Sequence, residues 1–122
     1  IVIAPSSPVV SIGTILDVPG VRAAVAARRD RVVAVSPIIG ERPVEGPADR
    51  FLAGVGVNEC SSTVMAAMYR DVASAFVIHD TEGPEVQAAV ASHDMRPVTA
   101  DILMPDRAQR ARLAGEVLES MA

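Results

Sequence analysis

Two stretches of the chain place hydroxyls, glycines and prolines directly after an apolar run. The first is residues 5–11, which follow the apolar residues 1–4 and contain Ser6, Ser7 and Ser11. A helix that begins near Ser11 would present hydroxyls together with free backbone N–H groups, and such a helix start can bind a phosphate without a lysine. The alternative is a plain turn in which Ser11 only caps the helix, and the residues leave both interpretations open.

The second stretch covers residues 36–50, where an apolar run ends in Ser36 and a loop bounded by Gly40 and Gly46 follows. Long loops after a strand are more often functional than the short connections typical of α/β proteins. Gly46 would let a ligand approach the backbone closely, and Pro47 is expected to begin a helix. Asp49 then lies in the first helical turn, where the helix dipole favours a carboxylate whether or not it contacts a ligand.

Other reactive side chains point to less specific roles. His79 and Asp80 follow an apolar run and could form an acid–base pair, although a capping role is more common there. Cys60 is the single cysteine, so an internal disulfide or a cysteine-based zinc site is excluded. The chain contains no lysine, which excludes a P-loop lysine and a Schiff-base lysine.

The elements that must position these residues alternate between strands and helices. Apolar runs predict strands over residues 1–4, 31–36, 75–78 and 96–100. Capping residues, prolines and apolar spacing predict helices over residues 12–16, 20–28, 47–53, 62–72, 84–92 and 105–121. In the last of these, Ala111, Ala114, Leu118 and Met121 are expected to form the apolar stripe. This alternation predicts an α/β fold with a parallel sheet and right-handed crossovers.

Composition narrows the class of protein. Half of the residues are apolar, but only one tyrosine and two phenylalanines occur, and the net charge is −4. Few aromatic side chains and dispersed basic residues argue against nucleic-acid binding. No apolar run approaches the length of a membrane span, so a soluble, cytoplasmic protein is expected. A chain that opens on a buried-type strand also predicts that further residues belong upstream.

Several segments resemble the CofD/FbiA family. Residues 3–16, continued by Val18-Pro19-Gly20-Val21-Arg22, are similar to its first conserved segment, although Ser7 stands where the family usually has Asn. Residues 35–40 and 46–49 are similar to its second segment, in the same order and at the same distance. Residues 69–71, the strand leading to His79-Asp80, and residues 101–104 also fit the family pattern.

The resemblance implies a Rossmann-like, doubly wound parallel sheet with helices on both faces, residues 1–122 being the C-terminal part of a larger domain. It implies transfer of a phospho-lactyl or phospho-enolpyruvyl group from a guanosine diphosphate-linked donor to the deazaflavin Fo in coenzyme F420 biosynthesis. GMP would be released and Mg²⁺ would offset negative charge. A homodimer is compatible with it. The residues expected to contact substrate or nucleotide are Ser6, Ser7, Pro8, Ser11, Gly40, Gly46, Pro47 and Asp49.

The family's glycine-rich loop and its acidic, metal-associated segment would precede Ile1, so no metal ligand or catalytic residue is assigned here. For the same reason, the 122 residues alone are expected to be inactive. Two other functions compete with the transferase. One is a CofD-like regulatory protein that binds nucleotide sugars without catalysis. The other is a receiver-like signalling domain with Asp80 as its phosphorylation site, which the missing lysine argues against.

Overall fold

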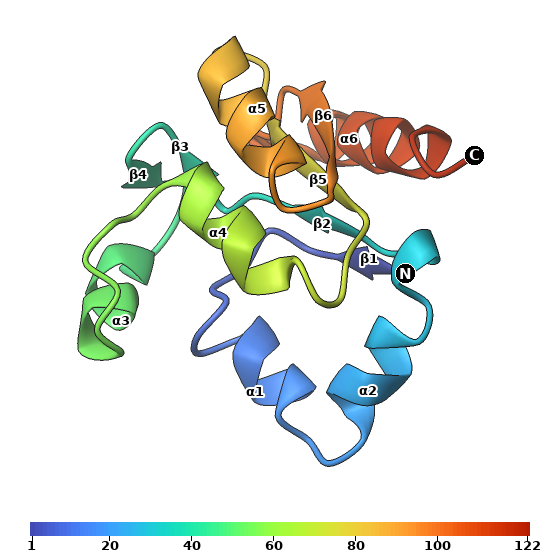
Figure 1. The fold of residues 1–122 in the computed structure, drawn as a ribbon. Coiled ribbons are helices and arrows are strands. Elements are labelled where there is room, and N and C mark those ends of the chain that lie inside the picture. Colours follow the sequence, from blue (N-terminus) through green and yellow to red (C-terminus); the bar gives the residue numbers. More distant parts are fainter.

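The computed structural model describes all 122 residues and shows a four-stranded parallel sheet in the order β1-β2-β5-β6 (Figure 1). The strands are β1 (Val2–Ile3), β2 (Val33–Val35), β5 (Ala75–His79) and β6 (Arg96–Ala100). Ile3 is in register with Ala34, which in turn pairs with Phe76. All four strands therefore point the same way and their carboxyl ends share one edge, which confirms the α/β class.

The helices lie on both faces of this sheet because side chains alternate along each strand. They are α1 (Ile12–Leu16), α2 (Val21–Ala26), α3 (Ala48–Gly54), α4 (Ser62–Tyr69), α5 (Pro84–Ala91) and α6 (Arg107–Glu119). Ala34 and Phe76 pack in the larger core cluster with residues of α1, α3, α4 and α5. Val33 and Val77 face the other way and pack with Leu113 and Val117 of α6.

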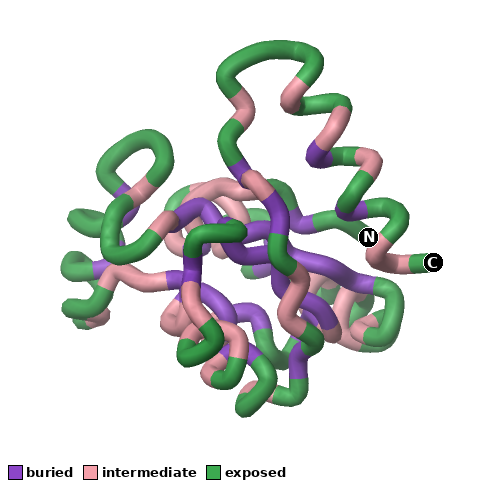
Figure 2. Tube along the Cα trace, turned by 90° about the horizontal axis from the view of Figure 1, so that it is seen from above, coloured by how far each residue is buried: buried purple, intermediate pink, exposed green.

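Burial is concentrated in the strands at the centre of the molecule, and the outer faces of the helices are exposed (Figure 2). β2 and β5 consist entirely of buried residues. They are the two central strands, with neighbours on both sides and helices on both faces, and this explains their continuous apolar sequence. No helix is long and apolar enough to cross a membrane.

The loop expected over residues 38–46 contains a small antiparallel hairpin instead. Its strands are β3 (Ile38–Ile39) and β4 (Arg42–Pro43), and Ile39 pairs with Arg42 across a two-residue turn. Gly40 occupies the first turn position with φ of 62°, a conformation that glycine adopts without strain. Ile38 is fully buried in the larger core cluster, so this segment is anchored by packing.

The apolar stripe expected in the last helix is shifted in the structure. In α6 the buried residues are Leu113 and Val117, whereas Ala111, Ala114 and Leu118 are exposed. Spacing alone allowed either stripe, but a branched aliphatic pair four residues apart buries more apolar surface than alanines do.

Candidate functional site

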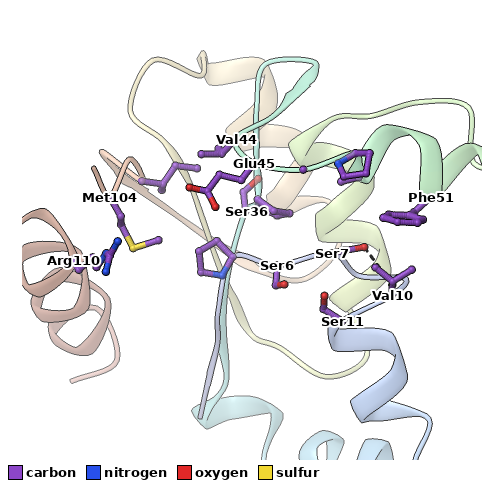
Figure 3. A pocket seen from close by; sticks show the side chains of 16 residues that line it. Ser6, Ser7, Val10, Ser11, Ser36, Val44, Glu45, Phe51, Met104 and Arg110 are labelled. Atoms are coloured by element: carbon purple, nitrogen blue, oxygen red, sulfur yellow. Dashed lines mark hydrogen bonds between the residues drawn. The ribbon is translucent and has the colours of Figure 1, made fainter. Parts of the chain in front are cut away.

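A cavity of about 450 Å³ lies at the carboxyl edge of the sheet, and we call it the serine cavity. Three segments line it: Pro5, Ser6, Ser7, Val10 and Ser11; Ser36, Pro37, Val44, Glu45, Gly46, Pro47, Ala48 and Phe51; and Ile102, Met104 and Arg110. Figure 3 shows Ser6, Ser7, Ser11 and Phe51 on one side and Met104 and Arg110 on the other, with Ser36 and Glu45 between them. The first two segments are those singled out in the sequence.

Ser7 organises the first segment. Its hydroxyl accepts hydrogen bonds from the N–H groups of Val9 and Val10, both at 3.3 Å, and its carbonyl accepts from the N–H groups of Ser11 and Ile12. The side chain of Ser11 makes no capping hydrogen bond, so the expected cap is wrong. The N–H groups at the start of α1 bond to the Ser7 backbone carbonyl instead, and the Ser11 hydroxyl is left free at the cavity.

Pro8 is buried and does not line the serine cavity. Its carbonyl oxygen would lie 2.4 Å from a Cβ added at Gly13, in the first turn of α1. A backbone atom cannot withdraw as a flexible side chain can, so only glycine lets the turn of residues 5–11 pack this closely on α1. The contribution of Pro8 that the structure supports is therefore to hold the serine turn in place.

In the second segment, Gly46 and Pro47 line the cavity at the turn that precedes α3. Gly46 has φ of 71°, and the following residue, Pro47, is the N-cap of α3. Asp49 is exposed and is not among the lining residues.

Burial, and secondarily the negative charge of Asp49, raise the pKa of the Cys60 thiol. Cys60 is therefore mainly protonated at neutral pH and is not an activated nucleophile.

Gly40 lines a different cavity of about 400 Å³, which we call the glutamate cavity. Its acidic residues are Glu41, Glu82 and Glu85, and its hydroxyls come from Ser61, Ser62, Thr63 and Thr81. The β3–β4 hairpin carries Gly40 at its tip and separates it from Gly46. The structure thus brings together Ser6, Ser7, Ser11, Gly46 and Pro47, and places Gly40, Pro8 and Asp49 elsewhere.

A buried hydrogen-bond network connects the walls of the two cavities. The Ser62 hydroxyl lies 2.9 Å from the Ser36 hydroxyl and donates to Oε2 of Glu82 at 2.8 Å. The same carboxylate oxygen accepts from the backbone N–H of His79 at 3.3 Å. Ser62 and Glu82 were not identified from the sequence as site residues. Their only sequence signal is that each lies near the start of a predicted helix.

His79 is buried at the carboxyl end of β5 and lines neither cavity. Its Nδ1 lies 2.9 Å from the Thr81 hydroxyl and accepts a hydrogen bond from the Thr81 N–H. Its Nε2 lies 3.4 Å from Oδ1 of Asp101 and has no hydrogen-bond partner. Nδ1 also lies 3.0 Å from Oδ1 of Asp80, so the two residues singled out in the sequence are in contact. Because His79 lines neither cavity, these contacts serve to fix the turn after β5.

Asp101 holds the third wall of the serine cavity. Its Oδ1 accepts from the N–H of Leu103 at 3.0 Å, and its backbone carbonyl accepts from Arg112 of α6 at 2.6 Å. The loop after β6 is thereby tied to α6, and Ile102, Met104 and Arg110 reach the cavity from this junction. The family resemblance included residues 101–104, but nothing in it pointed to Arg110.

The residues present do not form a metal site. No three or more His, Cys, Asp or Glu side chains come close enough to hold a metal ion.

Comparison with known proteins identifies the family. The model of the family described as 2-phospho-L-lactate transferase CofD matches residues 1–119. The chain is 43% identical over 114 residues to the phosphoenolpyruvate transferase of Kitasatospora aureofaciens, covering 93% of this chain and 35% of that protein. It is 38% identical over 119 residues to the phosphoenolpyruvate transferase of Streptomyces griseus, covering 98% of this chain and 37% of that protein. It is also 38% identical over 115 residues to the phosphoenolpyruvate transferase of Thermobifida fusca, with 94% and 34% covered.

The chain therefore spans about a third of the length of the curated relatives it matches. The family match itself runs from the first residue to within three of the last, with all three serine-cavity segments inside it. On this evidence, the chain belongs to the CofD family.

Proposed function

We propose that this chain forms one wall of the substrate cleft of a transferase of coenzyme F420 biosynthesis. The transferase moves a phospho-enolpyruvyl or phospho-lactyl group from a guanosine diphosphate-linked donor to Fo, and GMP leaves. The observation that carries the proposal is the serine cavity. In it the turn of residues 5–11 meets the start of α3 at the carboxyl edge of a parallel sheet, where ligands of open α/β sheets bind.

The lining suits an anionic ligand with an apolar part. Ser6, Ser7 and Ser11 supply hydroxyls at one side, and a hydroxyl can donate to a phosphate oxygen. Val44 and Phe51 supply apolar surface on the same cavity. In phosphoryl transfer the protein contributes mainly positioning and charge stabilisation, so a wall of this kind acts by orienting the donor.

The transfer needs no covalent intermediate with this chain. The terminal hydroxyl of Fo attacks the phosphorus that bears the organic acid, the bond from that phosphorus to the GMP oxygen breaks, and the hydroxyl proton is lost to solvent or a base. The name phosphoenolpyruvate transferase, shared by the relatives, favours the enolpyruvyl donor.

The test uses the full-length protein with Fo, Mg²⁺ and either the enolpyruvyl or the lactyl donor, and follows GMP and the Fo product by chromatography. We expect equal amounts of GMP and product, with faster turnover of the enolpyruvyl donor. The 122-residue chain alone is the matched control and should release no GMP. If the full-length protein releases none with either donor, and its melting temperature rises with UDP-sugars, the regulatory alternative replaces this proposal.

A further inference from the structure

Arg110 is the one basic residue that lines the serine cavity. It is exposed, and its guanidinium makes no ion pair or side-chain hydrogen bond. Arg112, two residues later on the same helix, is by contrast bonded to Asp101 and Glu116. Glu45 also lines the cavity but forms no ion pair with Arg110. The positive charge at this wall is therefore available to a ligand.

The geometry of α6 explains why Arg110 faces the cavity. The sheet-facing residues of this helix are Leu113 and Val117, and Arg110 precedes them by three and seven residues. At about 100° per residue these three positions lie on one face of the helix. Arg110 therefore lies on the same face of α6 as Leu113 and Val117, one turn closer to the start of the helix. There α6 passes the carboxyl edge of the sheet, and Figure 3 shows Arg110 beside Met104. Arg107, one turn earlier, is also exposed but does not line the cavity.

Arg110 is also badly placed for helix stability. It is the fourth residue of α6, close to the positive end of the helix dipole, where a cation is unfavourable. No carboxylate lies within ion-pair distance to compensate. A residue that breaks a local rule without a structural compensation is expected at functional sites.

We propose that Arg110 binds an oxyanion of the substrate in the serine cavity, either a donor phosphate or the donor carboxylate. This inference rests on the proposed function, because it assigns a residue to the same cavity. A planar guanidinium can pair with both kinds of oxyanion through two parallel N–H donors, which a lysine cannot do. The Ser6 and Ser11 hydroxyls approach from the opposite side, so the anion would lie between neutral and charged donors.

The experiment measures ligand affinity by calorimetry for the full-length protein and three variants. The variants are Arg110→Gln, Arg110→Lys and the matched control Arg107→Gln. Two ligands separate the two oxyanions, because GDP carries phosphates only and the GDP-linked donor also carries the carboxylate. We expect Arg110→Gln to weaken the affected ligand about tenfold, as for loss of a hydrogen bond to a charged group. Arg107→Gln should bind like the wild type, Arg110→Lys should lie between, and affinity for the acceptor Fo should not change.

Weaker binding of GDP by Arg110→Gln would identify the phosphate, and weaker binding of the donor alone would identify the carboxylate. Unchanged affinity for both ligands, or an equal loss in Arg107→Gln, would overturn the inference while leaving the transferase intact. If the wild-type protein binds neither guanosine ligand, the proposed function fails instead. In that case inorganic pyrophosphate is used as the ligand in place of GDP and the donor. Equal affinity of the wild type and Arg110→Gln for pyrophosphate would overturn the proposal that Arg110 binds an oxyanion.

Discussion

Replacing Gly46 with alanine probes the serine cavity at a position whose structural cost can be worked out. Gly46 has φ of +71°, and a Cβ built there meets no atom within 4 Å. The cost is therefore conformational and not steric, about 1–2 kcal/mol for an L-residue in the left-handed region. Valine would add the strain of a β-branched side chain, so a Gly46→Val variant would lose stability as well as activity and could not separate the two effects.

Gly40 provides the matched control for this substitution. Its φ is +62° and its Cβ would also meet nothing within 4 Å, but it lines the glutamate cavity. Gly46→Ala and Gly40→Ala should therefore lower the free energy of unfolding by similar amounts. Only the Gly46 methyl group would occupy space at the serine cavity, where displacing a bound phosphate from its hydrogen-bonding position should raise the donor KM about tenfold or more.

The assay is GMP release by the full-length variants, together with their melting temperatures. We expect equal shifts in melting temperature and a raised KM in Gly46→Ala alone. Equal kinetic effects of the two variants would refute the placement of the donor in the serine cavity. A larger stability loss in Gly46→Ala than in Gly40→Ala would show instead that Gly46 serves the geometry of the α3 start.

Three further substitutions test the contacts described above in the full-length protein. Ser11→Ala should change the free energy of unfolding by less than about 0.5 kcal/mol, because no capping bond is lost, while donor affinity falls. Ser62→Ala should cost about 1.5–3 kcal/mol in denaturant unfolding, since it removes a buried bond to the Glu82 carboxylate, whereas the cap variant Ser61→Ala should cost about 1 kcal/mol. Tyr69→Phe should stabilise the protein by about 1 kcal/mol, because the Tyr69 hydroxyl is buried without a partner. Burial raises the pKa of Tyr69, so the wild type should lose stability as pH rises above the ordinary value of 10.0 and Tyr69→Phe should lose less.

Local sequence signals were sufficient for most of the elements. Pro97 does not interrupt the strand predicted over residues 96–100, and β6 has those bounds, because its N–H is not needed at an edge strand. The short helix α1 also matches its prediction, although the reason given for its start, a cap by Ser11, was wrong. The Ser7 hydroxyl bonds the N–H groups of Val9 and Val10 within the turn, and the Ser7 backbone carbonyl accepts from the N–H groups of Ser11 and Ile12 at the helix start, which the sequence pattern does not reveal.

The meeting of residues 5–11 with Gly46 and Pro47 could be predicted because parallel strands end at a common edge. The rule requires the direction of each strand. That direction follows from the alternation of strands and helices along the chain, so the rule can be applied without knowing any tertiary contact. It could not predict that Gly40, six residues before Gly46, faces another cavity. The β3–β4 hairpin reverses the chain between them, and its pairing depends on burial of Ile38 against α4 and β5.

The fold class, the family and the two loops at the carboxyl edge could therefore be predicted from the residues alone, because they follow from local periodicity and from segments that are continuous in the chain. The hydrogen bonds that link Ser36 to Ser62 and Glu82, and the place of Arg110 in the wall of the serine cavity, are visible only in the folded chain. These contacts join residues 20 or more positions apart in the chain. They form only when each helix is rotated about its axis so that its apolar face packs on the sheet. The spacing of apolar residues predicted the wrong rotation for α6.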